Sequence, residues 1–136
     1  MKTLYTVTAT TTGGHDRNVR TDDGVLDLEL NKGEEKTIAE QLFAAGYSAS
    51  FFNALQEVAK EHKVAMEDAS VTASVDLGET EEGDREMSVN LDVYIPGVDI
   101  ETGEEMINEA HEICTYSWAT RDNIDITLNL MLDEDE

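Results

Sequence analysis

The chain has 136 residues, of which 31 are Asp or Glu and 9 are Lys or Arg, giving a formal net charge of −22. This length predicts a single domain over residues 1–132, followed by an acidic tail at 133–136. The scarcity of positive charge argues against binding to nucleic acid, whose phosphates must be met by Lys and Arg, and against binding to anionic membranes. No apolar run approaches the roughly 20 residues that a membrane helix needs.

Cys114 is the single cysteine, which excludes an internal disulfide and a cysteine-rich metal site. The three histidines, His15, His62 and His111, show no short ligand spacing, so we expect no metal and no cofactor. The N-terminal residues run directly into an alternating apolar and polar pattern, which leaves no room for a signal peptide. We therefore expect a cytoplasmic protein.

Five segments alternate between apolar and polar residues, which is typical of strands with one covered face, and the short segment at residues 18–21 is a candidate for a further strand. The first is ended by Gly13 and Gly14, and the segment at residues 26–30 follows a turn at residues 22–24. The predicted strands cover residues 4–11, 18–21, 26–30, 71–77, 87–95 and 124–132.

Two longer segments predict helices. The first covers residues 38–63 behind a capping box at residues 37–40, and its first half, 42–52, is apolar or small on every side. The second begins at another capping box, residues 102–105, and carries an apolar stripe of Met106, Ile107, Ala110, Ile113 and Cys114. The order β-β-β-α-β-β-α-β predicts an α+β fold. Because one layer of strands cannot surround the first helix, we expect an obligate homodimer packed around it.

Four motifs follow one another along the chain. Residues 13–16 read GGHD, 40–47 read EQLFAAGY, 110–117 read AHEICTYS and 119–125 read ATRDNID. In this order they resemble the OsmC/Ohr family, the organic hydroperoxide resistance proteins, over nearly the whole chain. The resemblance implies an OsmC-like fold, an intertwined homodimer around a buried central helix, and a role in the oxidative stress response.

The resemblance also implies a thiol peroxidase that acts on bulky organic hydroperoxides. In the family an arginine and a glutamate hold a peroxidatic cysteine as a thiolate, which is the nucleophilic form. The resulting sulfenic acid condenses with a second cysteine, whose position matches Cys114. A lipoyl-bearing protein or another dithiol is the implied reductant.

This chain departs from the family at the decisive position. The family pattern Gly-Tyr-x-x-Cys-Phe reads here from Gly46 to Phe51, with Ser50 in the peroxidatic position. A serine hydroxyl is not ionised near neutral pH without a base, and its oxygen has no sulfenic-acid chemistry, so the chain is expected to be inactive by the family route. Ser50 is either an engineered change or a natural divergence. The loss of the Asn-Pro that usually precedes Glu40, and Thr115 in place of the family proline, favour divergence.

The candidate site residues are therefore Ser50, Cys114, Glu40, His15 and Arg17. His15 occupies the position of the family arginine, and Arg17 or Arg20 is an alternative source of the guanidinium. Each has a purely structural interpretation as well. Glu40 completes the capping box, His15 lies in a turn, and Cys114 belongs to an apolar stripe.

Two other functions stay open at this point. The first is a catalytically inactive OsmC-fold protein that binds a hydrophobic small molecule in an apolar pocket near Tyr47, Phe51 and Phe52. The second is a peroxidase that uses Cys114 alone. It is the weaker of the two, because a helix C-terminus carries negative partial charge and disfavours a thiolate.

Overall fold

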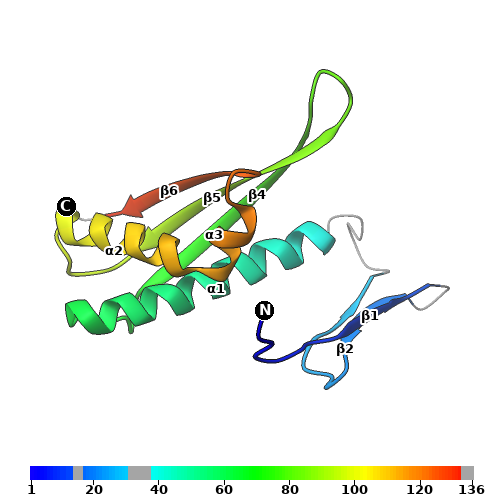
Figure 1. The fold of residues 1–136 in the computed structure, drawn as a ribbon, viewed down its shortest axis with the longest axis horizontal. Coiled ribbons are helices and arrows are strands. Elements are labelled where there is room, and N and C mark those ends of the chain that lie inside the picture. Colours follow the sequence, from blue (N-terminus) through cyan, green and yellow to red (C-terminus); the bar gives the residue numbers. More distant parts are fainter. Residues whose placement is uncertain (14–16, 31–37, 133–136) are drawn as a thin grey trace. The chain divides into compact units, whose positions relative to one another are not determined.

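The computed structural model describes residues 1–13, 17–30 and 38–132 (Figure 1). The chain forms two compact units, Met1–Ala39 and Glu40–Glu136. The described elements follow the order β-β-β-α-β-β-α-α-β, which confirms the predicted α+β class and adds one short helix. Among the described residues, none of the helices combines the length and the apolar character that a membrane span requires.

The N-terminal unit holds a three-stranded antiparallel sheet of β1 (Ala9–Thr12), β2 (Asn18–Thr21) and β3 (Asp27–Glu29). The strand predicted at residues 18–21 is present with the same bounds as β2. The strand predicted at residues 4–11 is shorter than expected, since β1 begins only at Ala9. The predicted turn between β2 and β3 is present. The Asp23 carboxylate accepts hydrogen bonds from the Thr21 hydroxyl (2.7 Å) and the Val25 amide (3.0 Å), and Gly24 takes a positive φ of 76°.

The C-terminal unit is a second sheet with helices packed on one face. Its strands are β4 (Ser70–Glu79), β5 (Arg85–Tyr94) and β6 (Asp125–Met131), in the order β4-β5-β6. β4 and β5 form an antiparallel hairpin, while β5 and β6 are parallel. A parallel pair needs a crossover connection, and the helices α2 (Ile100–Ile113) and α3 (Thr115–Thr120) provide it.

The long helix α1 (Ile38–His62) buries one face in the core of this unit. Tyr47, Phe51 and Leu55, at spacings of four residues, are completely buried. On the opposite side Ala45 and Ala49 are exposed. As expected from the sequence, the sheet and α2 of one chain cover only one face of this helix, and the second copy that was expected to cover the other face stays a prediction.

α2 begins at a different capping residue from the one predicted. Asp99, not Thr102, is the N-cap, and its carboxylate accepts a hydrogen bond of 3.2 Å from the Thr102 amide. Hydrogen bonds from Thr102 also lower the pKa of Asp99. The other predicted capping residue, Thr37, lies outside the described residues. Ile113, assigned to the buried stripe, is 49% exposed.

Sequence periodicity did not predict α3, a helix of six residues. Such a helix is too short to show a hydrophobic period, and Cys114 separates it from α2 with an extended backbone (φ −69°, ψ 127°). The chain therefore turns sharply at Cys114, and α3 folds back against α1, which Ser117 contacts through the hydroxyl of Tyr47.

We expect Leu55→Ala to lower the free energy of unfolding by about 2–5 kcal/mol, because the substitution leaves a cavity under a completely buried side chain. Gln56→Ala is the matched control. It lies next in the same helix but is exposed, so its effect is expected to stay within about 0.5 kcal/mol. Urea unfolding followed by circular dichroism measures both values. Equal losses in the two variants would contradict this assignment of the buried face of α1.

Candidate functional site

Ser50 and Cys114 lie in contact, although 64 residues separate them in the chain. The Ser50 Oγ is 3.5 Å from the Cys114 Sγ. Ser50 projects from the middle of α1 and is half-buried, whereas Cys114, at the junction of α2 and α3, is 1% exposed. The fold thus brings together the two positions that the resemblance associates with a pair of thiols.

The backbone of Cys114 belongs to two helix ends at once. Its amide donates to the Ala110 carbonyl (2.9 Å) at the end of α2, and its carbonyl accepts from the Trp118 amide (3.0 Å) in α3. From the sequence this thiol was expected only at a helix C-terminus, where a thiolate is disfavoured. The structure shows that Cys114 also directly precedes the first turn of α3.

A chain of buried hydrogen bonds lies beside this pair. Ser117 Oγ is 2.8 Å from the Tyr47 hydroxyl and 2.8 Å from His111 Nδ1. Tyr47 and Ser117 are 0% and 1% exposed. A neutral His111 with its proton on Nε2 satisfies every partner, because Tyr47 then donates to Ser117 and Ser117 donates to Nδ1. The network fixes α3 to α1 one turn away from Ser50.

Burial lowers the pKa of His111, and the positive charge of Arg121 lowers it further, while Glu112 acts weakly in the opposite direction. His111 also borders a surface pocket of about 420 Å³ that Arg121 and Asp122 help to line. The imidazole is thus held in the neutral form that the hydrogen-bond chain requires, yet it lies close to solvent.

Three aromatic rings pack around this part of α1. The centroids of Tyr47 and Tyr116 are 5.5 Å apart, and each ring lies 6.1 Å from Phe43. Gly46 permits this packing, because a Cβ at that position would lie 2.5 Å from the Tyr116 hydroxyl oxygen. Of the residues predicted to form an apolar pocket, Tyr47 and Phe51 belong to the core at 0% exposure, and Phe52 keeps some exposed surface.

The remaining predicted site residues lie elsewhere. Glu40 is half-buried in the first turn of α1, ten residues before Ser50, which is a rise of about 15 Å along a helix. Arg17 and Arg20 belong to the N-terminal unit, beside and within β2. His15 lies outside the described residues. The roles of Glu40, His15 and Arg17 stay predictions.

Sequence reasoning included neither Ser117 nor His111 among the candidate site residues. Two signals pointed to them. Ser117 and Tyr47 both fall inside the motifs quoted above, and a buried tyrosine hydroxyl requires a partner. The identity of that partner follows only from the fold of α3 against α1.

Residues 32–129 match the sequence pattern of a family described as OsmC-like protein. The chain belongs to the OsmC/Ohr family. It is 40% identical over 134 residues to the organic hydroperoxide resistance protein OhrB of Bacillus subtilis, covering 93% of this chain and 98% of OhrB. It is 39% identical over 137 residues to an organic hydroperoxide resistance protein of Xanthomonas axonopodis pv. citri, covering 95% and 96%.

A solved structure shows the same OsmC-like fold. The crystal structure of an organic hydroperoxide resistance protein from Elizabethkingia anophelis, with thiocyanate bound, superposes with a TM-score of 0.85 at 42% identity. The match covers 98% of this chain and all of the other. Both the family and the fold that the motifs predicted are therefore confirmed for this OsmC/Ohr chain.

We expect the His111 pKa to make the stability of this OsmC/Ohr chain depend on pH. Because the folded-state pKa is lower than the unfolded value of about 6.5, the unfolded state binds more protons between the two values. This contribution is fully present above about pH 6.5 and decreases as the pH falls toward the folded-state pKa. Urea unfolding of wild type and His111→Asn between about pH 7.5 and 5.5 measures it, since the asparagine cannot titrate there.

The free energy of unfolding of the wild type, relative to that of His111→Asn, should decrease as the pH falls. His62→Asn is the matched control, which removes a histidine but leaves His111 and its partner Ser117 in place. Parallel pH profiles for wild type and His111→Asn would contradict the assignment of a depressed pKa to His111.

Proposed function

We propose that this chain takes part in the response to organic hydroperoxides and that Ser50 and Cys114 occupy its two-thiol peroxidase site. One observation carries the proposal: the Ser50 Oγ lies 3.5 Å from the Cys114 Sγ in a chain 40% identical to an organic hydroperoxide resistance protein. With cysteine at position 50 the protein is a thiol peroxidase. With serine it lacks the atom that the reaction oxidises.

The proposed cycle needs sulfur at both positions. A thiolate at position 50 attacks one oxygen of the peroxide, the O–O bond breaks, and the alkoxide leaves with a proton as an alcohol. The sulfenic acid formed at position 50 then condenses with the Cys114 thiol, which releases water and leaves a disulfide. An external dithiol reduces that disulfide and is itself oxidised.

Serine prevents the first of these steps. Its hydroxyl stays protonated near neutral pH, and its contact with the Cys114 sulfur supplies no general base that could activate it. Oxygen also forms no stable equivalent of a sulfenic acid. Cys114, which is 1% exposed, keeps its thiol in the core beside the serine.

The remaining parts of the proposal concern groups around the pair. The OsmC/Ohr resemblance also implies a cation that lowers the pKa of a thiol at position 50, for which Arg17 or His15 is the candidate, and a carboxylate that orients the cation, for which Glu40 is the candidate. A lipoyl-bearing protein or another dithiol serves as the reductant. A single free cysteine suits the reducing cytoplasm, where we place the protein.

We expect Ser50→Cys to consume cumene hydroperoxide or tert-butyl hydroperoxide with dihydrolipoamide as reductant, at least about 100-fold faster than the parent chain. The reason is that the new sulfur supplies the nucleophile within reach of Cys114. Mass spectrometry after one equivalent of peroxide should show the loss of two hydrogens that marks an internal disulfide.

Two variants serve as controls for that experiment. Ser50→Ala should stay at the level of the parent, and Ser50→Cys combined with Cys114→Ser should reduce one equivalent of peroxide without forming an internal disulfide. A folded Ser50→Cys variant with no turnover would contradict the proposed function, as would rapid peroxide consumption by the parent chain.

We also propose that the protein is a homodimer in which a second copy covers the exposed face of α1. Supporting this, Ala45 and Ala49 are exposed in a single chain, while the opposite side of the helix lies in the core. Small residues four apart on one face allow another backbone to approach closely. The OsmC/Ohr resemblance implies the same intertwined dimer.

Light scattering coupled to size exclusion should therefore give twice the 15.0 kDa mass of one chain. Ala49→Arg should shift the protein toward monomer, since the substitution places a long charged side chain at the contact. Ala49→Ser, which stays small, should remain dimeric. A parent protein that is monomeric at all concentrations would refute the dimer without affecting the peroxidase proposal.

A further inference from the structure

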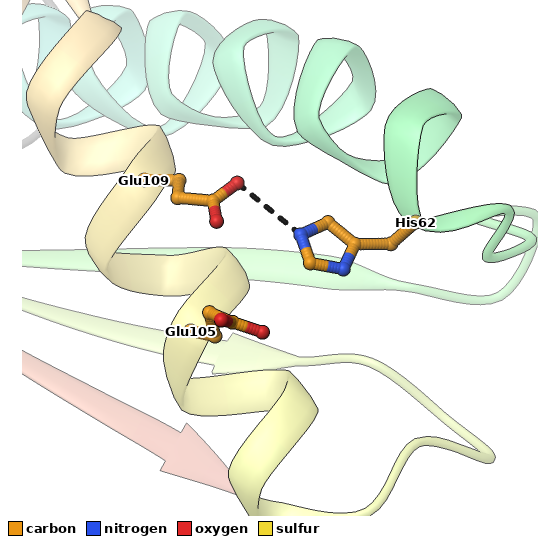
Figure 2. Close-up of side chains that lie close together, drawn as sticks. All are labelled: His62, Glu105 and Glu109. Carbon is orange, nitrogen blue, oxygen red and sulfur yellow. Dashed lines mark hydrogen bonds and ion pairs between the residues drawn. The ribbon is translucent and has the colours of Figure 1, made fainter.

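A second group of side chains gathers at the C-terminal end of α1. His62, in its last turn, faces Glu105 and Glu109, which lie one turn apart on α2 (Figure 2). One ligand atom from each of the three residues lies within 4.8 Å of the other two. The peroxide chemistry proposed above does not use this group. Ser50 lies twelve residues earlier in α1, a rise of about 18 Å.

The three side chains are held in place by the packing of the two helices. His62 Nε2 is 3.2 Å from Glu109 Oε1, and their side chains are 21% and 41% exposed. Met106 and Ile107, between the two glutamates, are buried in the core, which fixes the face that α2 presents. Glu105 and Glu109 are four residues apart, so their carboxylates extend from the same side of the helix.

We propose that His62, Glu105 and Glu109 bind a first-row divalent cation of the Zn²⁺ class. One imidazole nitrogen and two carboxylate oxygens form a ligand set that such ions accept, with solvent in the remaining position. The imidazole favours Zn²⁺ over Mg²⁺ and Ca²⁺, which prefer oxygen ligands. Two carboxylates and a neutral imidazole also carry a charge of −2, which a divalent ion neutralises.

The ion would join the C-terminal end of α1 to α2. Without it, the negative charges of Glu105 and Glu109 repel each other across one helical turn, in a chain whose formal net charge is already −22. When the ion is bound, both carboxylates are attracted to its positive charge, which outweighs their mutual repulsion. The same carboxylates therefore have opposite effects on stability in the absence and presence of the metal.

The first test uses this opposite effect of the glutamates on stability without and with the metal. In EDTA, Glu105→Gln should leave the Tm of the full chain unchanged or raise it, because one of the two repelling charges is removed. In excess Zn²⁺, the wild type should gain Tm by mass action and Glu105→Gln should gain much less. Glu104→Gln is the matched control, since it removes the same charge from the exposed neighbouring position and should respond to Zn²⁺ like the wild type.

The second test identifies the ligand atom directly. Long-range ¹H–¹⁵N spectra resolve the imidazoles of His15, His62 and His111, and one equivalent of Zn²⁺ should shift the Nε2 resonance of His62. Calorimetry should give one site per chain, with affinity at least about 10-fold weaker in Glu109→Gln and in His62→Gln. Cys114→Ser should bind Zn²⁺ as the wild type does, because the buried thiol is not a ligand.

The outcomes that overturn the proposal are equally specific. An equal Zn²⁺-dependent gain in Tm for wild type and Glu105→Gln excludes this site. A Zn²⁺-dependent shift of the imidazole resonances of His15 or His111, in place of those of His62, excludes it as well. Stronger binding of Mg²⁺ than of Zn²⁺ refutes the assigned class of ion. None of these results depends on peroxide turnover, so the metal site and the proposed function fail or stand separately.

Discussion

The packing of α1 against α2 and α3 is the constraint on which the rest of this structure depends. α1 inserts Tyr47, Phe51 and Leu55 into the core, each completely buried, and α2 contributes Met106 and Ala110 from the other side. Burial of side chains of this size supplies most of the favourable free energy of folding. The same packing sets the distance between Ser50 and Cys114, because each lies on one of the two packed segments.

Polar groups at this contact are few, and they are satisfied. Tyr47, Ser117 and His111 form one chain of hydrogen bonds, and no buried side-chain nitrogen or oxygen among the described residues lacks a partner. Leaving a buried polar group without a partner costs more free energy than one hydrogen bond contributes. The hydrogen bonds among Tyr47, Ser117 and His111 therefore favour one arrangement of α3 against α1. Together with the packing of Tyr116 against Tyr47 and Phe43, this explains how a helix of only six residues keeps a fixed position beside the site.

Position 50 combines a family fold with a residue that the proposed cycle cannot use. Oxygen and sulfur at position 50 differ little in size, so serine fits against Cys114 without disturbing the core. They differ greatly in acidity and in their capacity to be oxidised. The architecture of the OsmC/Ohr family is therefore retained here with a substitution that removes the reactive atom of the proposed cycle. At the C-terminal end of the same helix, the contact between α1 and α2 brings together a different set of reactive groups, His62, Glu105 and Glu109.

The sequence by itself determined the elements and the family. Alternation located β4, β5 and β6, because a strand with one covered face must alternate, and the motifs around Tyr47 and Cys114 were sufficient to identify the family. Sequence reasoning did not find α3, the capping role of Asp99 or the exposure of Ile113. A short helix carries no hydrophobic period, Asp99 and Thr102 both suit a cap, and the extent of burial depends on what packs against a helix.

Only the tertiary structure decided which distant groups meet. Spacing along the chain reveals neighbours within one helix, such as Glu105 and Glu109, but it cannot reveal contacts between helices. Histidine spacing therefore indicated no metal site, whereas the fold places His62 beside two glutamates more than forty residues away. Ser50 and Cys114, and Tyr47 and Ser117, meet for the same reason: contacts between helices are fixed by the packing of the whole core and not by any local pattern.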